Sequence, residues 1–332
     1  MLEKIDLNAF RLLPIPTEQE IMENWKGDVE DPVVSICCIT YNHENYIEDT
    51  LKGFLIQKTE FPFEILIHDD ASTDKTTGIL KRYEKAYPRI IKLIVQNENQ
   101  YVKGERIFPK LYEISNGEFI SLCEGDDFWC DINKINRDVG FLNNNPNLSF
   151  VFSPALQIKN GQPVFVRNKY TSTKIDNIDI PWILNAGGGF FPTCSATFRQ
   201  EMIEALPNWF NLHGTGDYPL AILARLRGNL GYINQVMTVY RSHDKSVSHQ
   251  KYISKKDAAC VSRLKYKKSI VFFNAMFEDG VIDIKQYYNM IDKERYMLVK
   301  RDFMQKGLSL WQAFWGVHGF LNKAKLIISL VR

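Results

Sequence analysis

Short apolar runs alternate with amphipathic stretches from residue 33 to residue 123. Four runs rich in β-branched and aromatic residues have the length and composition of buried strands. These runs are residues 33–40, 63–68, 90–95 and 118–123. Apolar residues at helical spacing lie between them and predict helices over residues 45–57, 74–86 and 105–115. The alternation predicts an α/β domain with a mostly parallel sheet flanked by helices.

The pattern becomes less regular after residue 143. Prolines and the run Gly187-Gly188-Gly189 indicate short strands and loops up to residue 191. Further strands are predicted at 193–198, 230–233 and 237–240, and helices at 199–205 and 217–227. Beyond residue 255 the pattern is helical, with breaks near Asp279-Gly280 and Gly307. We therefore expect an N-terminal extension (1–32), an α/β domain (33–250) and a C-terminal basic helical region (251–332).

The charge is divided unevenly along the chain. The 332 residues carry a formal net charge of +2, with 45% hydrophobic and 24% charged residues, which is typical of a globular protein and excludes disorder. Residues 251–332 hold 16 basic and 7 acidic side chains, whereas residues 1–250 hold 25 basic and 32 acidic ones. The small net charge and the lack of a recognised DNA- or RNA-binding motif argue against a nucleic-acid partner.

The cysteines and the termini predict a cytoplasmic location. No two of the six cysteines have the C-x-x-C spacing of a zinc or redox site, so we expect reduced thiols. Charged residues interrupt the first ten positions, which is unlike a signal peptide. The best candidate for a transmembrane helix, residues 307–322, lacks charged residues but is too short to span a membrane.

Carboxylates follow two of the predicted strands. In parallel α/β sheets, ligands bind beyond the carboxyl ends of the strands. Asp69 and Asp70 follow the second strand, where they can accept hydrogen bonds from a base or a ribose, or can cap the next helix. EGDDFW, residues 124–129, follows the fourth strand. Its clustered carboxylates suit Mg²⁺ or Mn²⁺, and the alternative is a solvated acidic turn.

Two further residues are candidates for chemistry. Asp217 lies between the glycine-flanked turn GTG and a predicted helix, where it can act as a general base or as an N-cap. His243 ends a strand in YRSHDKS, and a histidine there can be a metal ligand or a structural side chain.

The ordered set of these motifs resembles the inverting family-2 glycosyltransferases with the GT-A fold. The motifs are ITYNHENYI (39–47), IHDDASTD (67–74), CEGDDFW (123–129), GDYPL (216–220) and YRSH (240–243). The resemblance covers residues 33–245. It implies a Rossmann-like GT-A fold for the catalytic domain, with the C-terminal helical region as an appendage.

The resemblance also implies a nucleotide-sugar site at the first two motifs. Thr40, Tyr41 and Asn42 would line the base and ribose. Asp70 matches the family aspartate that holds the base, and Asp69 lies beside it. Ala71 stands where the family usually has glycine.

The remaining family positions concern the metal ion and the catalytic general base. Asp126 and Asp127 match the end of the D-x-D motif, which contacts the ribose and the metal, while the first position is Glu124 instead of aspartate. His243 would add a metal or phosphate contact. Asp217 matches the general base.

The implied activity is a metal-dependent, inverting sugar transfer. Mn²⁺ or Mg²⁺ would hold a nucleoside diphosphate sugar, with a UDP-sugar as the favoured donor. The acceptor would be a hydroxyl of a glycan or a lipid-linked molecule in surface polysaccharide biosynthesis. One alternative is a non-catalytic nucleotide-sugar or glycan-binding module. Another is a sugar-phosphate nucleotidyltransferase, which needs a glycine-rich loop that TYNHENY lacks.

The basic C-terminal region leaves two interpretations open. Lysines near residues 265–268 precede an aromatic stretch with Trp311, Phe314, Trp315 and Phe320. A basic, aromatic helix can lie on the cytoplasmic face of an anionic membrane. Alternatively, the aromatic side chains pack on the catalytic domain.

Overall fold

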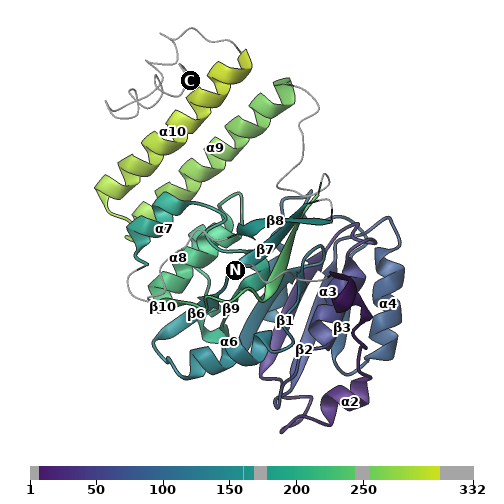
Figure 1. Ribbon diagram of the computed structural model, residues 1–332. Coiled ribbons are helices and arrows are strands. Elements are labelled where there is room, and N and C mark those ends of the chain that lie inside the picture. Colours follow the sequence, from purple (N-terminus) through teal and green to yellow (C-terminus); the bar gives the residue numbers. More distant parts are fainter. Residues whose placement is uncertain (1–6, 160, 168–177, 244–254, 307–332) are drawn as a thin grey trace. The chain divides into compact units, whose positions relative to one another are not determined.

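The computed structural model describes residues 7–159, 161–167, 178–243 and 255–306 (Figure 1). The chain forms two compact units. The first comprises Met1–Ala205 and Leu220–His243, and the second comprises Leu206–Pro219 and Asp244–Arg332.

A seven-stranded sheet is the centre of the first unit. Its strand order is β10-β6-β9-β4-β1-β2-β3. The strands are β1 (Val34–Thr40), β2 (Phe63–Asp69), β3 (Ile91–Val95), β4 (Phe119–Glu124), β6 (Leu148–Phe152), β9 (Thr197–Arg199) and β10 (Asn229–Tyr232). Only the short β9 runs antiparallel to its neighbours β4 and β6. The predicted α/β fold with a mostly parallel sheet is confirmed.

The predicted helices connect the parallel strands. They are α3 (Ile47–Leu55), α4 (Thr76–Ala86) and α5 (Ile107–Glu113), followed by the unpredicted α6 (Lys134–Asn143). Every residue of β2 is buried, and β1 is nearly so. Strands covered on both faces read as continuous apolar runs, which explains why VSICCIT and FEILIH show no polar alternation.

A second sheet of four strands has the order β5-β11-β7-β8. Its strands are β5 (Phe128–Trp129), β7 (Ala155–Lys159), β8 (Gln162–Arg167) and β11 (Thr238–Ser242). β11 pairs antiparallel with β5, through Thr238 with Trp129 and Val239 with Phe128. This pairing brings the end of β11 beside the acidic residues 124–127.

Several segments differ from the predicted pattern. The strand expected at 193–198 is a 3₁₀ turn, η1 (Thr193–Ser195), followed by the short β9, and the helix expected at 199–205 is the 3₁₀ turn η2 (Gln200–Ile203). Besides α6, the helices that were not predicted are α1 (Leu7–Leu12), α2 (Glu18–Met22) and α7 (Ile180–Ala186).

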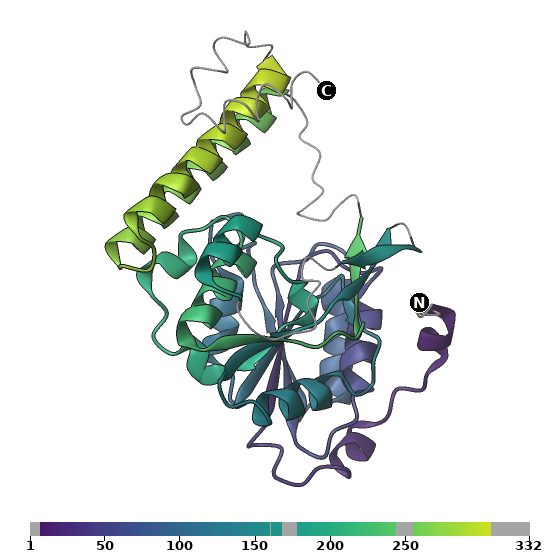
Figure 2. The same cartoon turned by 60° about the vertical axis from the view of Figure 1, so that its left-hand side comes forward.

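The second unit contains two long helices, α9 (Lys255–Glu278) and α10 (Ile284–Lys306), preceded by η3 (Asn208–Asn211). They lie side by side (Figure 1 and Figure 2). Gly280, at the predicted break between them, has φ +70°. Phe272 packs against Trp209 and Tyr218. In the part of the chain that the structure describes, no helix is long and apolar enough to cross a membrane. The aromatic stretch 311–320 lies outside the described residues.

A buried ion pair within α6 lies against the large sheet. The Lys134 ammonium lies 2.9 Å from the Asp138 carboxylate, and both side chains are at most 1% exposed. Lys134 also donates to the hydroxyls of Ser121 and Thr197, and lies over the Trp129 ring at 4.2 Å from its centroid. Several partners therefore compensate the burial of this charge.

Replacing Asp138 with Ala should destabilise the first unit by about 3–5 kcal/mol, because the Lys134 charge would remain buried without its carboxylate. Urea unfolding followed by tryptophan fluorescence measures the change. The Glu48→Ala control removes an exposed ion pair with Arg82 and should have little effect. Equal loss in the two variants would contradict the prediction.

Candidate active site

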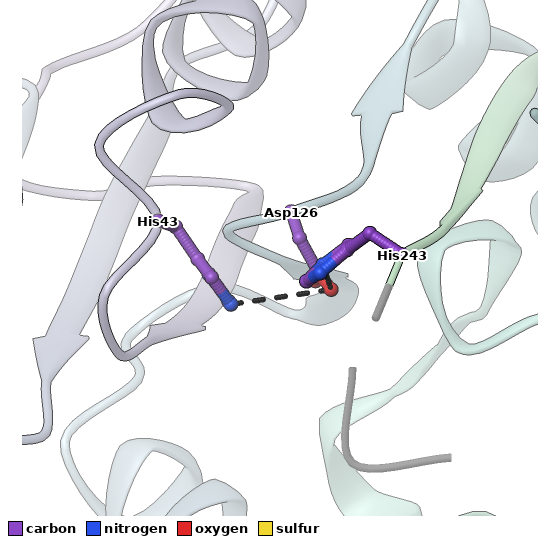
Figure 3. Close-up of side chains that lie close together, drawn as sticks. All are labelled: His43, Asp126 and His243. Carbon is purple, nitrogen blue, oxygen red and sulfur yellow. Dashed lines mark hydrogen bonds and ion pairs between the residues drawn. The ribbon is translucent and has the colours of Figure 1, made fainter. Parts of the chain in front are cut away.

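Three side chains meet at the carboxyl edge of the large sheet (Figure 3). The Asp126 Oδ2 atom lies 3.0 Å from His243 Nε2 and 3.9 Å from His43 Nε2. One potential ligand atom from each residue lies within 4.8 Å of the other two. This set is the candidate metal site within the described residues.

The topology explains why residues far apart in sequence converge there. His43 follows β1 and Asp126 follows β4, which pair in parallel, so both loops emerge at the same edge. His243 directly follows β11, whose pairing with β5 places it beside the loop that contains Asp126. Each ligand candidate is thus fixed by a paired strand.

The donor atoms fit a divalent transition metal. Two imidazoles and one carboxylate offer nitrogen and oxygen ligands, whereas Mg²⁺ is usually held by oxygen alone. Burial raises the pKa of Asp126, but the hydrogen bond with His243 and the charges of His43 and His243 outweigh it, so the net pKa is lowered. Burial lowers the pKa of His43. Both shifts favour the metal-binding forms, an ionised carboxylate and a neutral imidazole.

Close contacts orient the His43 ring. Its Nδ1 atom lies 3.1 Å from Thr40 Oγ1, which leaves Nε2 directed toward Asp126. Gly125 permits this arrangement because a Cβ at that position would lie 2.5 Å from Thr40 Oγ1 and 3.0 Å from His43 Nδ1. Thr40 was predicted to line the nucleotide, and the structure gives it this contact with His43.

Only two of the four predicted metal ligands lie in the three-residue set. Asp126 and His243 belong to the candidate site, whereas Glu124 and Asp127 are not part of the three-residue set. The buried Asp127 carboxylate accepts a 2.8 Å hydrogen bond from the Arg241 backbone N–H. Burial, together with the charges of Asp126 and Glu124, raises the pKa of Asp127 well above its usual value.

Asp69 makes local contacts in the candidate nucleotide region. Its carboxylate accepts hydrogen bonds from the Ser72 N–H and hydroxyl and from the Thr77 hydroxyl. Neither Asp69 nor Asp70 caps α4, whose N-cap is Lys75. Instead, Asp74 accepts from the Thr76 N–H at the first turn of the helix.

Asp70 organises the chain after β3. Its carboxylate accepts backbone hydrogen bonds from Gln100 at 2.7 Å and Tyr101 at 3.1 Å. The side chain of His68 lies buried with Nε2 3.5 Å from Asp70 Oδ1. The Asp70 carboxylate therefore holds the loop at residues 100–101 beside β2.

The residues after β1 have different environments. Asn42 adopts φ +56°, and its side-chain oxygen accepts from the Thr73 N–H at 2.7 Å, which ties two loops together. Tyr41 is 43% exposed, so its ring is accessible to a ligand. Among Thr40, Tyr41, Asn42, Asp69 and Asp70, Tyr41 is thus the side chain most open to stacking on a base.

Asp217 is the first residue of α8 (Asp217–Arg227), which has the predicted bounds. Asp217 belongs to the second unit, whereas the residues of α8 from Leu220 onward belong to the first.

His43 was not predicted from the sequence to belong to the site. The signal that could have found it is its position in the loop after β1, one strand away from the acidic loop.

The chain belongs to glycosyl transferase family 2, since the sequence model of this family matches residues 35–206. The uncharacterized protein Mb1547 of Mycobacterium bovis is 30% identical over 227 residues, which cover 67% of this chain and 62% of that protein. The chain thus spans less than two thirds of the length of this relative.

Solved structures share the fold. S. aureus TarS residues 1–349, in complex with UDP-GlcNAc, aligns with a TM-score of 0.53 at 17% identity over 81% of both chains. Mannosyltransferase PcManGT from Pyrobaculum calidifontis, in complex with GDP-Man and Mn²⁺, aligns with a TM-score of 0.51 at 16% identity over 98% of this chain and 85% of that chain. These similarities confirm the predicted GT-A fold.

Replacing Gly125 with Ala should weaken Mn²⁺ binding by about 10- to 100-fold, because the added methyl group displaces Thr40 and His43. Titration of the free Mn²⁺ signal by electron paramagnetic resonance measures the affinity. The control is Gly140→Ala in α6, where an added Cβ meets no atom within 4 Å. Unchanged Mn²⁺ affinity in Gly125→Ala would contradict the assigned geometry.

Proposed function

We propose that this protein is an inverting glycosyltransferase that transfers a sugar from a nucleoside diphosphate sugar to an acceptor hydroxyl with the help of Mn²⁺. The observation that supports this most directly is the convergence of His43, Asp126 and His243 at the carboxyl edge of a family-2 sheet. Ligands of α/β sheets bind at this edge.

His43, Asp126 and His243 would hold the metal ion. When bound, the ion would supply positive charge that stabilises the diphosphate leaving group. The mixed nitrogen and oxygen donors favour Mn²⁺ over Mg²⁺, which narrows the prediction from the sequence. Asp127 would support the site through its hydrogen bond with the Arg241 backbone, and Glu124 would contribute negative charge beside it.

The donor would lie across the loops that follow β1 and β2. Tyr41 is exposed enough to stack on the base, with Thr40, Asn42 and Asp69 holding the surrounding loops. Asp70 would position the base through the loop at Gln100 and Tyr101. A UDP-sugar is the proposed donor. UDP-GlcNAc in TarS supports this choice, and GDP-Man in PcManGT provides the contrasting nucleotide to test.

Asp217 would act as the general base. Its carboxylate would accept the proton of the acceptor hydroxyl while the oxygen attacks the anomeric carbon, and the bond to the nucleoside diphosphate breaks on the opposite face. One displacement of this kind inverts the anomeric configuration. If no residue acts as the general base, the alternative function applies, which is a module that binds nucleotide sugars or glycans without transfer.

The acceptor would be a hydroxyl of a surface glycan or of a lipid-linked precursor. Support comes from TarS, a poly(ribitol-phosphate) beta-N-acetylglucosaminyltransferase, which is 32% identical over 103 residues. These residues cover 30% of this chain and 17% of TarS. A peripheral position on the cytoplasmic face of a membrane stays a prediction. The exposed side chains of Lys265, Lys267 and Lys268 on α9 agree with it.

Replacing Asp217 with Asn should lower the transfer rate by about 10²- to 10⁴-fold, because the amide cannot accept the acceptor proton. Affinity for the donor should stay unchanged. Transfer is measured with a panel of UDP- and GDP-sugars and Mn²⁺, and donor binding is measured by thermal shift. A variant that transfers at the wild-type rate would disprove the role of Asp217 as base.

Two matched substitutions distinguish the contributions of Asp126 and Asp127 to metal binding. Asp126→Asn should weaken Mn²⁺-dependent nucleotide binding by at least about tenfold, because a charged ligand is lost. Asp127→Asn should have a smaller effect, since the raised pKa of Asp127 reflects an environment unfavourable to its charge and the amide oxygen can still accept from Arg241. Calorimetric titration with and without Mn²⁺ compares the two. The reverse order of effects would favour Asp127 as the ligand.

A further inference from the structure

Arg241 makes several contacts with the acidic loop at residues 124–127. Its backbone N–H donates to Asp127 Oδ1 at 2.8 Å, and its Nη1 atom donates to the Asp126 carbonyl oxygen at 2.9 Å. Thr50 of α3 holds the same loop from another direction, because its hydroxyl reaches the carbonyl oxygens of Gly125 and Asp127. Main-chain movement of the loop is therefore restricted on both sides of Asp126.

Arg241 also lies next to the second ligand candidate. It is two residues before His243, and alternate residues of an extended chain project from the same face. The Tyr46 ring contacts both side chains, with the Arg241 guanidinium 5.4 Å and the His243 ring 4.7 Å from its centroid. The guanidinium also lies 4.4 Å from the centroid of the Phe128 ring.

A buried carboxylate on α3 balances the charge of Arg241. Asp49 Oδ2 lies 2.5 Å from Arg241 Nη2, and the two side chains are 11% and 8% exposed. Arg11 of α1 forms two further hydrogen bonds with the Asp49 carboxylate. The neighbouring Phe10 packs on Phe128 with ring centroids 4.7 Å apart.

The N-terminal helix α1 is therefore joined to the acidic loop through one continuous network. Arg11 contacts Asp49, Asp49 contacts Arg241, and Arg241 contacts the main chain at Asp126. Arginine suits the central position because its planar fork can donate in two directions at once.

We propose that Arg241 is a positioning residue that fixes the spacing of Asp126 and His243 for Mn²⁺, with Asp49 and Arg11 holding its guanidinium in place. The inference rests on the proposed function, since it concerns the same metal site. Arg241 itself does not ligate the metal. It acts through the main chain of Asp126 and through the strand that ends at His243.

The test compares Arg241→Lys with the wild-type protein. Lysine keeps the positive charge beside Asp49, but it lacks the fork that reaches Asp49 and the Asp126 carbonyl together. We expect about 10- to 100-fold weaker Mn²⁺ affinity, measured by electron paramagnetic resonance titration, with a melting temperature close to that of wild type. The matched control is Arg82→Lys, because Arg82 forms an exposed ion pair with Glu48, the neighbour of Asp49. It should bind Mn²⁺ as wild type does.

A double variant distinguishes positioning from a purely structural role. Arg241→Met with Asp49→Asn removes both charges of the buried pair, so stability should largely return relative to Arg241→Met alone. If Arg241 positions the metal residues, Mn²⁺ affinity stays low in the double variant. If affinity returns together with stability, the role is structural and the inference is wrong. The double variant also provides this test should a single variant fail to fold.

The outcomes separate this inference from the proposed function. A wild-type protein that takes up Mn²⁺, together with an Arg241→Lys variant of equal affinity, would overturn the positioning role alone. A wild-type protein that takes up no Mn²⁺ would overturn the metal site, and the positioning role with it.

Discussion

The carboxylates that follow β4 impose the central constraint on the first unit. Asp126 and Asp127 are adjacent in sequence, and Asp127 is buried while Asp126 is partly buried, so their charges require partners that the loop itself does not contain. His243 and the Arg241 backbone supply these partners from the end of β11. The pairing of β11 with β5 therefore brings nitrogen donors to the acidic loop.

Close packing beneath the loop turns this constraint into a defined geometry. Gly125 lets the chain pass against Thr40, and Thr40 in turn contacts the His43 ring. On the other side, Thr50 fixes two carbonyl groups of the loop. The proposed metal site would be preorganised, because the backbone of the loop that carries Asp126 is held by contacts that do not involve a metal.

The loops after β1 and β2 show the same use of polar side chains for structure. Asp69, Asp70 and Asn42 all accept hydrogen bonds from neighbouring loops. The family resemblance assigned all three to the nucleotide. In the structure these three side chains hold neighbouring loops together, and under the proposed function a nucleotide would lie on the surface of these loops. The ring of Tyr41 is exposed there.

Between residues 33 and 123 the order of strands and helices could be predicted from the sequence alone, because runs buried on both faces and amphipathic helices leave clear periodic patterns. The sequence also determined the acidic motifs and the family. Weak patterns hid α6 and the 3₁₀ turns near residues 193–203, where short elements depend on tertiary contacts. Only the tertiary structure decided that Asp126 faces two histidines while Asp127 faces the Arg241 backbone. Adjacent carboxylates are equivalent in a motif, and their roles differ only once β-strand pairing fixes the direction of each side chain.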